Sequence, residues 1–357
     1  MTVVVDAPYQ HGGAITAGKV EVELMGLGGG VHGWKHAAKT PPLFIETEEP
    51  ADWTLDDFLS WTEHSRDRLD ALILEHGGIV LRGFPMATPS EFSRFAAIFP
   101  PYKAGYVGGK SPRKKVAEGV LESTRLAESY KIILHSEMAY MKRYPPRIAF
   151  FCRQMAEEGG ETIIGSMHEF MDLLPVDLRE KLVQHRVRVI RNFSPRGNTA
   201  RAVVVDHPEK IGWDDAFFTQ SEAQVDAHCL ALGIQSIWND DGSLTLIEEM
   251  DAVTPHPITG KLFYRNNLHT NENWNTPETA AMTAEIRGGQ KYPSGIFLED
   301  GSTLTPEEVS KIKQIWARIE LAWRWRNGDI MILDNLQVAH GRNPFSGPRE
   351  VLVALFA

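Results

Sequence analysis

Two short stretches that lie far apart in the chain carry side chains able to bind one metal ion. The first spans residues 134–138 and contains His135 and Glu137, and the second spans residues 334–342 and contains His340. Two histidines and one carboxylate form the ligand set of a mononuclear non-haem Fe(II) centre, which leaves other positions of the metal open. Residues i and i+2 of a strand point to the same side. His135 and Glu137 can therefore reach one ion, and the fold must bring in His340.

A His-x-Glu pattern is weak evidence by itself, because the chain has thirteen histidines. A second copy starts at His207 and lies among aspartate, proline and lysine residues, a composition typical of a turn. We interpret that copy as solvated surface. For His135 taken alone, a structural histidine would be the better interpretation, so the metal-site hypothesis depends on the elements around it.

Length and composition are those of an ordinary globular chain. The 357 residues are compatible with two average domains or one large domain. A net charge of −10, with the acidic residues spread out, argues against nucleic acid or an anionic membrane as the partner. The two cysteines, Cys152 and Cys229, exclude a disulfide framework and fit a reducing compartment. We recognise neither a signal peptide nor a membrane-spanning stretch, so we expect a cytoplasmic enzyme.

The elements that must position the two stretches are many short strands and several capped helices. Residues 1–45 are rich in glycine and predict an irregular N-terminal segment, and residues 46–357 are expected to form a single domain. A basic run over residues 110–115 is interpreted as a solvated face, with a lid as the alternative. Predicted helix caps are Thr54, Thr88, Ser166 and Thr305. Predicted strands span residues 79–81, 131–137, 148–152, 187–190, 244–247, 330–333 and 350–356. This order favours a mainly β fold with helices (α+β), a jelly roll covered by helices.

The order of these motifs resembles that of the Fe(II)/2-oxoglutarate dioxygenases of the taurine dioxygenase and clavaminate synthase group. After His-x-Glu come Gly-Gly-Glu-Thr at residues 159–162, Gly-Asp-x-x-x-x-Asp-Asn at residues 328–335, His-Gly-Arg at residues 340–342 and a late arginine. Leu-Arg-Gly-Phe at residues 81–84 matches the N-terminal part of that group. The segments 148–152 and 256–260 are most similar to its members in natural-product pathways, including syringomycin-type hydroxylases.

The resemblance assigns roles residue by residue. His135, Glu137 and His340 correspond to the metal ligands of the group. Thr162 and an arginine correspond to the residues that bind the distal carboxylate of 2-oxoglutarate, a task suited to a planar guanidinium. Arg349 is the candidate arginine. Its spacing from His340 is shorter than in several members of the group, so Arg342 is a rival.

Other polar residues near the motifs carry weaker hypotheses. Lys131 lies on the same predicted strand face as His135, so it could contact the keto acid or the substrate, or be solvated. Asn266 and Asn267 end a predicted strand that could border the substrate, with a structural role as the alternative. Asp334 and Asn335 are expected to shape the turn behind His340.

The resemblance implies an Fe(II)- and 2-oxoglutarate-dependent oxygenase with a double-stranded β-helix core. Its cofactors would be Fe(II), 2-oxoglutarate and O₂, with release of succinate and CO₂. The expected reaction is hydroxylation of an unactivated C–H of an amino acid or an amino-acid-derived intermediate, free or on a carrier protein. Epoxidation, desaturation and cyclisation stay open, as does the different class of cupin-like metal proteins that act as hydrolases, isomerases or binding proteins without redox chemistry.

Overall fold

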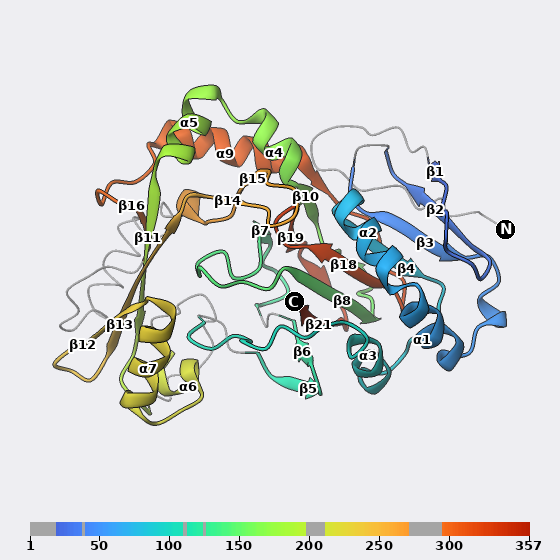
Figure 1. Ribbon diagram of the computed structural model, residues 1–357, viewed down its shortest axis with the longest axis horizontal. Coiled ribbons are helices and arrows are strands. Elements are labelled where there is room, and N and C mark those ends of the chain that lie inside the picture. Colours follow the sequence, from blue (N-terminus) through green and yellow to red (C-terminus); the bar gives the residue numbers. More distant parts are fainter. Residues whose placement is uncertain (1–18, 38–39, 110–112, 124–125, 198–210, 271–294) are drawn as a thin grey trace.

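A computed structural model describes residues 19–37, 40–109, 113–123, 126–197, 211–270 and 295–357. Its largest element is a nine-stranded sheet, shown at the centre and right of Figure 1. In spatial order its strands are β1 (Val20–Val22), β2 (Val31–Lys35), β3 (Leu43–Thr47), β4 (Gly78–Arg82), β18 (Ile330–Asp334), β8 (Arg147–Gln154), β21 (Glu350–Phe356), β6 (Val120–Glu122) and β5 (Lys115–Ala117).

A smaller sheet packs against one face of the nine-stranded sheet. Its strands, in spatial order, are β17 (Glu320–Leu321), β10 (Ile164–Ser166), β19 (Val338–Arg342) and β7 (Ile132–His135). Between the two sheets lies an apolar core to which β8 contributes Phe150 and β18 contributes Met331, facing Ile164 and Val338 of the small sheet. Burial of these side chains away from water joins the two sheets.

Helices cover the outer faces of both sheets. Against the nine-stranded sheet lie α1 (Leu55–His64), α2 (Arg66–His76) and α3 (Pro89–Ala96), preceded by a short 3₁₀ helix, Pro50–Asp52. Against the small sheet lie α4 (Met167–Leu173), α5 (Val176–Gln184) and α9 (Pro306–Ile319). Ala149 and Phe151 of β8 face the first helix layer, and Ile148 and Phe150 face the second sheet. The predicted jelly roll covered by helices is confirmed.

A third sheet forms an arm at the left of Figure 1. In spatial order its strands are β12 (Gln235–Trp238), β13 (Leu244–Asp251), β11 (Arg186–Phe193) and β16 (Gly295–Leu298), with α6 (Trp213–Phe217) and α7 (Glu222–Leu232) beside them. Two short pairs, β14 (Val253–Pro255) with β15 (Leu262–Tyr264) and β9 (Glu158–Gly159) with β20 (Phe345–Ser346), complete the described strands.

The helix starts follow the sequence signals. Thr54, Thr88 and Thr305 each form a complete capping box with the third helical residue, which satisfies two backbone N–H groups at each start. The Ser166 hydroxyl accepts the backbone N–H of Glu169. The predicted helix after Thr54 is divided into α1 and α2, because the chain bends at the residue between them.

The N-terminal part of the described chain differs from the irregular segment predicted over residues 1–45. Residues 20–47 contain β1, β2 and β3, which extend the large sheet at one edge, and β3 pairs in parallel with β4. The apolar run Leu43-Phe44-Ile45 is fully buried there. Main-chain pairing to an existing sheet edge orders a segment whose own sequence carries many glycines. Residues 1–18 lie outside the described part.

A buried ion pair joins β4 to the start of β18. Arg82 donates from Nε and Nη2 to the two carboxylate oxygens of Asp329, at 3.0 and 2.6 Å, and both side chains are almost fully buried. In this bidentate geometry two parallel N–H···O bonds join the guanidinium to the carboxylate, which makes the ion pair strong and fixes its orientation. Arg82 and Asp329 belong to the Leu-Arg-Gly-Phe and Gly-Asp motifs, so these motifs meet in space and stabilise the sheet that carries the site.

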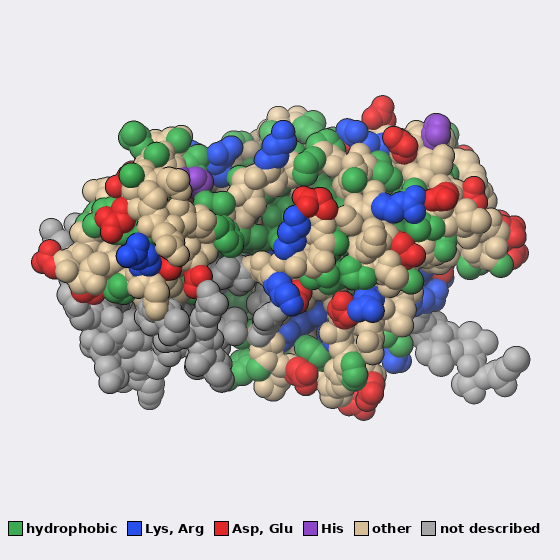
Figure 2. All heavy atoms as spheres, turned by 90° about the horizontal axis from the view of Figure 1, so that it is seen from below, with side chains coloured by type: hydrophobic (Ala, Val, Ile, Leu, Met, Phe, Trp, Pro, Cys, Tyr) green, Lys and Arg blue, Asp and Glu red, His purple; other side chains and the backbone are tan. Residues whose placement is uncertain are grey.

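Figure 2 shows the face seen from below in Figure 1, where Lys and Arg side chains gather around the middle. Among the residues that the structure describes, no helix has the length and apolar composition needed to cross a membrane.

Candidate metal centre

The two histidines come from neighbouring strands of the small sheet. His135 at the end of β7 pairs in register with His340 of β19, and their ring centroids lie 4.6 Å apart. The two strands can approach this closely because the next residue is Gly341, where a Cβ would lie 2.3 Å from the carbonyl oxygen of Ile132. Glycine in the His-Gly-Arg motif thus permits the strand contact that brings the two imidazoles together.

Glu137 is placed by a side chain from another part of the fold. Strand β7 ends at His135, so Glu137 lies in the turn that follows and not in the strand. The buried amide of Asn335 accepts the backbone N–H of Glu137 at 2.7 Å and donates to its carbonyl at 3.0 Å, and also to the carbonyl of Pro145 at 2.8 Å. The strand alternation used in the sequence argument is therefore not what positions Glu137, since Asn335 holds its backbone on both sides.

The three side chains form a cluster that suits a divalent metal. His135, Glu137 and His340 each offer one ligand atom, and these atoms lie within 4.8 Å of one another. Nδ1 of His135 lies 2.8 Å from the carbonyl oxygen of Ile133, and when Nδ1 donates there, Nε2 is free to bind a metal. Nε2 of His340 lies 3.5 Å from a carboxylate oxygen of Glu137. Two imidazoles and one carboxylate grouped this closely match the Fe(II) ligand set, and these residues fit the metal.

The electrostatics of the cluster keep its ligands in metal-binding form. Burial, assisted by the neighbouring His340, lowers the pKa of His135 to about 4, so its imidazole is neutral near pH 7. Burial opposes the charge of Glu137, but Arg113 and then His340 outweigh it and hold the pKa of this carboxyl well below its usual range. A neutral imidazole and an ionised carboxylate are the forms that coordinate a cation.

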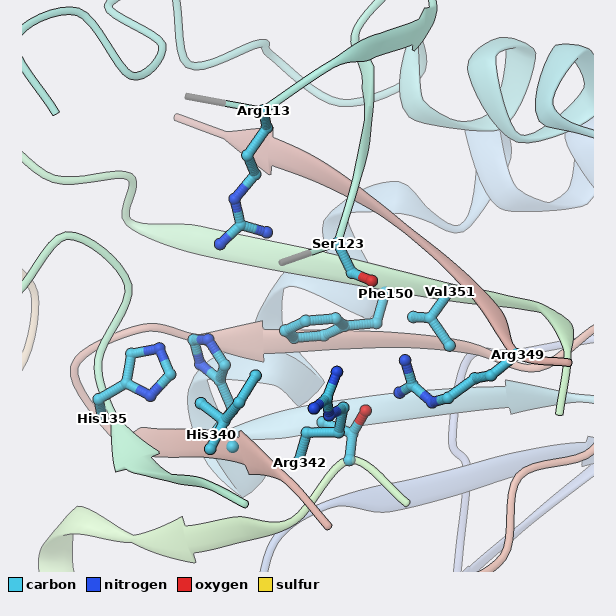
Figure 3. A pocket seen from close by; sticks show the side chains of 11 residues that line it. Arg113, Ser123, His135, Phe150, His340, Arg342, Arg349 and Val351 are labelled. Carbon is cyan, nitrogen blue, oxygen red and sulfur yellow. The ribbon is translucent and has the colours of Figure 1, made fainter. Parts of the chain in front are cut away.

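The pocket beside the cluster is lined by both histidines and by Thr162, Arg342 and Arg349 (Figure 3). Thr162 is buried, and its hydroxyl accepts a hydrogen bond from the indole N–H of Trp325 at 3.2 Å. The stretch that contains Thr162 runs along β19, where Gly341 donates its backbone N–H to the carbonyl of Ile163 at 2.8 Å. Thr162 therefore enters the same pocket as His340. Sequence analysis gave no signal for the contact with Trp325.

The two candidate arginines have different hydrogen-bond partners. Arg349 donates from Nε to the carbonyl of Gly160 at 2.8 Å, and its terminal nitrogens form no hydrogen bond with the part of the chain that the structure describes. The terminal nitrogens of Arg342 donate to the carbonyls of Leu126, Ala127 and Tyr130 at 2.8–3.1 Å. Arg349 therefore has donors for a ligand in the pocket, whereas Arg342 is engaged with the backbone.

The weaker candidates lie outside this arrangement. The Lys131 ammonium pairs with Glu320 at 2.6 Å. Asn266 donates to the carbonyl of Ala252 and accepts the backbone N–H of Leu268, so it holds a turn. Asn267 also lies in this turn, where its carbonyl accepts from Thr270. The second His-x-Glu pattern, at His207, lies outside the described residues.

Arg113 is a residue of the site that sequence reasoning missed. It belongs to the basic run that the sequence analysis interprets as a solvated face, and for Arg113 that interpretation is wrong. Its side chain is 8% exposed, lines the pocket and pairs with Glu137, with Nη2 at 3.1 and 3.3 Å from the carboxylate oxygens. Lys114 and Lys115 of the same run are 68% and 60% exposed, as expected. No local signal distinguishes Arg113 from these neighbours.

Comparison with known proteins finds one family model and several related chains. The family model described as "Taurine catabolism dioxygenase TauD, TfdA family" matches residues 37–355. The chain is 29% identical over 317 residues to the dapdiamide synthesis protein DdaC of Enterobacter agglomerans, covering 88% of this chain and 91% of that protein. It is 27% identical over 291 residues to a clavaminate synthase-like protein of Arabidopsis thaliana, covering 80% and 83%. The crystal structure of PvcB from Pseudomonas aeruginosa is similar with 16% identity and a TM-score of 0.48, over 88% of this chain and 85% of that chain.

Proposed function

Because this chain belongs to the taurine catabolism dioxygenase TauD, TfdA family, and is thus an Fe(II)- and 2-oxoglutarate-dependent dioxygenase, we propose that it hydroxylates an amino acid or an amino-acid-derived intermediate. The bond attacked is an unactivated C–H, and the products include succinate and CO₂. The observation that carries the proposal is the cluster of His135, Glu137 and His340, whose two imidazoles line one pocket together with Thr162 and Arg349. The non-redox alternative does not require a keto-acid carboxylate to be bound beside the metal.

In this proposal, His135, Glu137 and His340 hold Fe(II) on one side and leave the side toward the pocket open. The terminal nitrogens of Arg349 and the hydroxyl of Thr162 bind the distal carboxylate of 2-oxoglutarate, and Trp325 orients that hydroxyl. Arg342 keeps the backbone of residues 126–130 against the pocket and does not bind the keto acid. Lys131, Asn266 and Asn267 receive structural roles.

When bound, Fe(II) with 2-oxoglutarate and O₂ supplies the oxidation, in which the keto acid loses CO₂ and one oxygen atom is transferred to the substrate. The contribution of the protein is position and a dry environment. Arg349 and Thr162 fix one end of the keto acid, which sets the direction from which its other end reaches the metal. Ile132, Phe150 and Val351 line the same pocket with apolar surface and limit the access of water.

The substrate class is supported by the relatives. DdaC is a dapdiamide synthesis protein, and it matches most of this chain. A substrate built from an amino acid fits such a relative, either free or linked to a carrier protein. A pocket in which a few polar groups converge beside apolar side chains is also typical of a small-molecule site. A reducing compartment such as the cytoplasm fits the two buried free cysteines.

The proposal is tested in two stages. Anaerobic addition of Fe(II) and 2-oxoglutarate to the purified protein should produce the weak visible charge-transfer band of a chelated keto acid, and Zn(II) in place of Fe(II) should not. Amino acids and carrier-linked amino acids are then screened aerobically for succinate formation coupled to a gain of one oxygen atom in product mass. A protein that binds Fe(II) but gives no band with 2-oxoglutarate would refute the proposal.

A further inference from the structure

Arg113 is a buried cation on the pocket wall whose hydrogen-bond donors are only partly used. Its Nη2 pairs with Glu137, and its guanidinium lies over the ring of Tyr106 at 4.8 Å. Its Nε is buried and has no hydrogen-bond partner within the described residues. A guanidinium has five N–H donors, so Arg113 can bind a further acceptor while it contacts Glu137.

The position of Arg113 separates it from the keto-acid end of the pocket. In Figure 3 its guanidinium enters from a different side than that of Arg349, and the ring of Phe150 lies between them. On the described chain, Arg113 reaches the carboxylate of Glu137, and Arg349 reaches the carbonyl of Gly160. A ligand on Arg113 would therefore lie next to the metal ligands without competing for Arg349.

The charge of the loaded site calls for such a ligand. Fe(II), the Glu137 carboxylate and the two carboxylates of 2-oxoglutarate together carry one net negative charge, which Arg349 balances. Arg113 then adds a buried positive charge. The nearby Arg342 is hydrogen-bonded to backbone carbonyls and has the Glu128 carboxylate as a charged neighbour. Uncompensated charge away from water is unfavourable. An anionic group brought by the substrate would compensate it.

We propose that Arg113 binds a carboxylate of the substrate, through N–H groups that it does not use on Glu137. This inference rests on the proposed function and narrows its substrate class to compounds with a free carboxylate, such as free amino acids. An aminoacyl group joined to a carrier protein through a thioester lacks that carboxylate. The geometry thus favours the free acid over the carrier-linked form.

The alternative role for Arg113 is that of a counter-ion which only positions Glu137. The two roles differ in what a substitution changes. If Arg113 only positions Glu137, its substitution changes Fe(II) affinity and leaves the affinity for an acid relative to its amide unchanged. If Arg113 binds the substrate, its substitution changes that relative affinity. The comparison of acid with amide therefore decides between the roles.

The experiment measures binding by anaerobic calorimetry to the wild-type protein loaded with Fe(II) and 2-oxoglutarate. The probes are free L-amino acids, their primary amides and their N-acetylcysteamine thioesters, which resemble carrier-linked forms. Fe(II) affinity is measured in parallel. The variants are Arg113→Met and Arg113→Lys, with Lys114→Met as the control, since Lys114 is the exposed neighbour with the same charge.

The wild-type protein and Lys114→Met should bind at least one acid about thirtyfold more tightly than its amide or thioester, the lower end expected for losing a partner of a buried charge pair. Arg113→Met should lose this preference, and Arg113→Lys should keep part of it. Equal binding of acid and amide by the wild-type protein, binding of no acid, or an unchanged preference in Arg113→Met would overturn the inference while the 2-oxoglutarate band stands. Absence of that band would overturn the proposed function and this inference together.

Discussion

Replacing Arg349 by alanine should weaken 2-oxoglutarate binding far more than it weakens the fold. Burial and the neighbouring Arg342 lower the pKa of Arg349 to about 10, so the guanidinium is still charged at pH 7 although no carboxylate of the described residues is hydrogen-bonded to it. A keto acid would supply that partner. Removing one side of such a pair typically costs about 2–5 kcal/mol, which corresponds to a dissociation constant raised roughly thirtyfold to several thousandfold.

The assay is an anaerobic titration of Fe(II)-loaded protein with 2-oxoglutarate, followed through the visible band. Arg349→Lys should recover part of the affinity, because one ammonium keeps the charge but not the paired geometry of a guanidinium. Arg342→Ala is the matched comparison, and it should mainly loosen the backbone of residues 126–130. An unchanged titration in Arg349→Ala together with a large change in Arg342→Ala would refute the assignment and transfer the role to Arg342.

Further substitutions test the metal centre. His135→Ala or Glu137→Ala should abolish Fe(II) binding in equilibrium dialysis and leave the circular dichroism spectrum unchanged, since each removes one of three ligands. His207→Ala should be silent in the same assay, and the reverse pattern would mean that the wrong His-x-Glu had been chosen. Asn335→Ala should lower the free energy of unfolding by about 1–3 kcal/mol, because it leaves buried backbone groups of Glu137 without partners. Urea denaturation measures the free energy of unfolding, and a parallel Fe(II) titration should show weaker binding than in the wild-type protein. A wild-type free energy of unfolding together with wild-type Fe(II) affinity would contradict the role of Asn335 in holding the backbone of Glu137. The wild-type product should contain added oxygen and no halogen in chloride or bromide buffer, whereas Glu137→Gly should open a metal position to halide and weaken iron binding. The mass of the product distinguishes these outcomes, and a halogenated product from the wild-type protein would refute the assignment of Glu137 as a metal ligand.

Features encoded by neighbouring residues were predictable from the sequence. The capping boxes at Thr88 and Thr305 depend on residues three positions apart. Strands β18 and β21 are apolar runs buried on both faces, and the sequence predicts both within one residue. Motif order, compared with the family, indicated which of these elements would carry the site.

Features that depend on distant contacts were not predictable in this way. The sequence argument expected Glu137 to reach the metal through strand alternation, whereas Asn335 holds its backbone from 198 positions away. Composition predicted an irregular segment over residues 1–45, whereas pairing at the edge of the large sheet orders β2 and β3. In both cases the deciding partner is far away in sequence, so no local pattern reports it.

The three arginines of the pocket show how much depends on hydrogen-bond partners that sequence leaves open. Spacing alone made Arg342 and Arg349 rivals and left Arg113 within a basic surface run. In the fold, Arg342 donates to three backbone carbonyls, Arg349 keeps its terminal nitrogens toward the pocket, and Arg113 faces Glu137. A buried guanidinium needs acceptors for its N–H groups. The terminal nitrogens of Arg342 are already filled, which favours a structural role, and the donors left open on Arg349 and Arg113 are the basis of our proposal that these two bind anionic ligands.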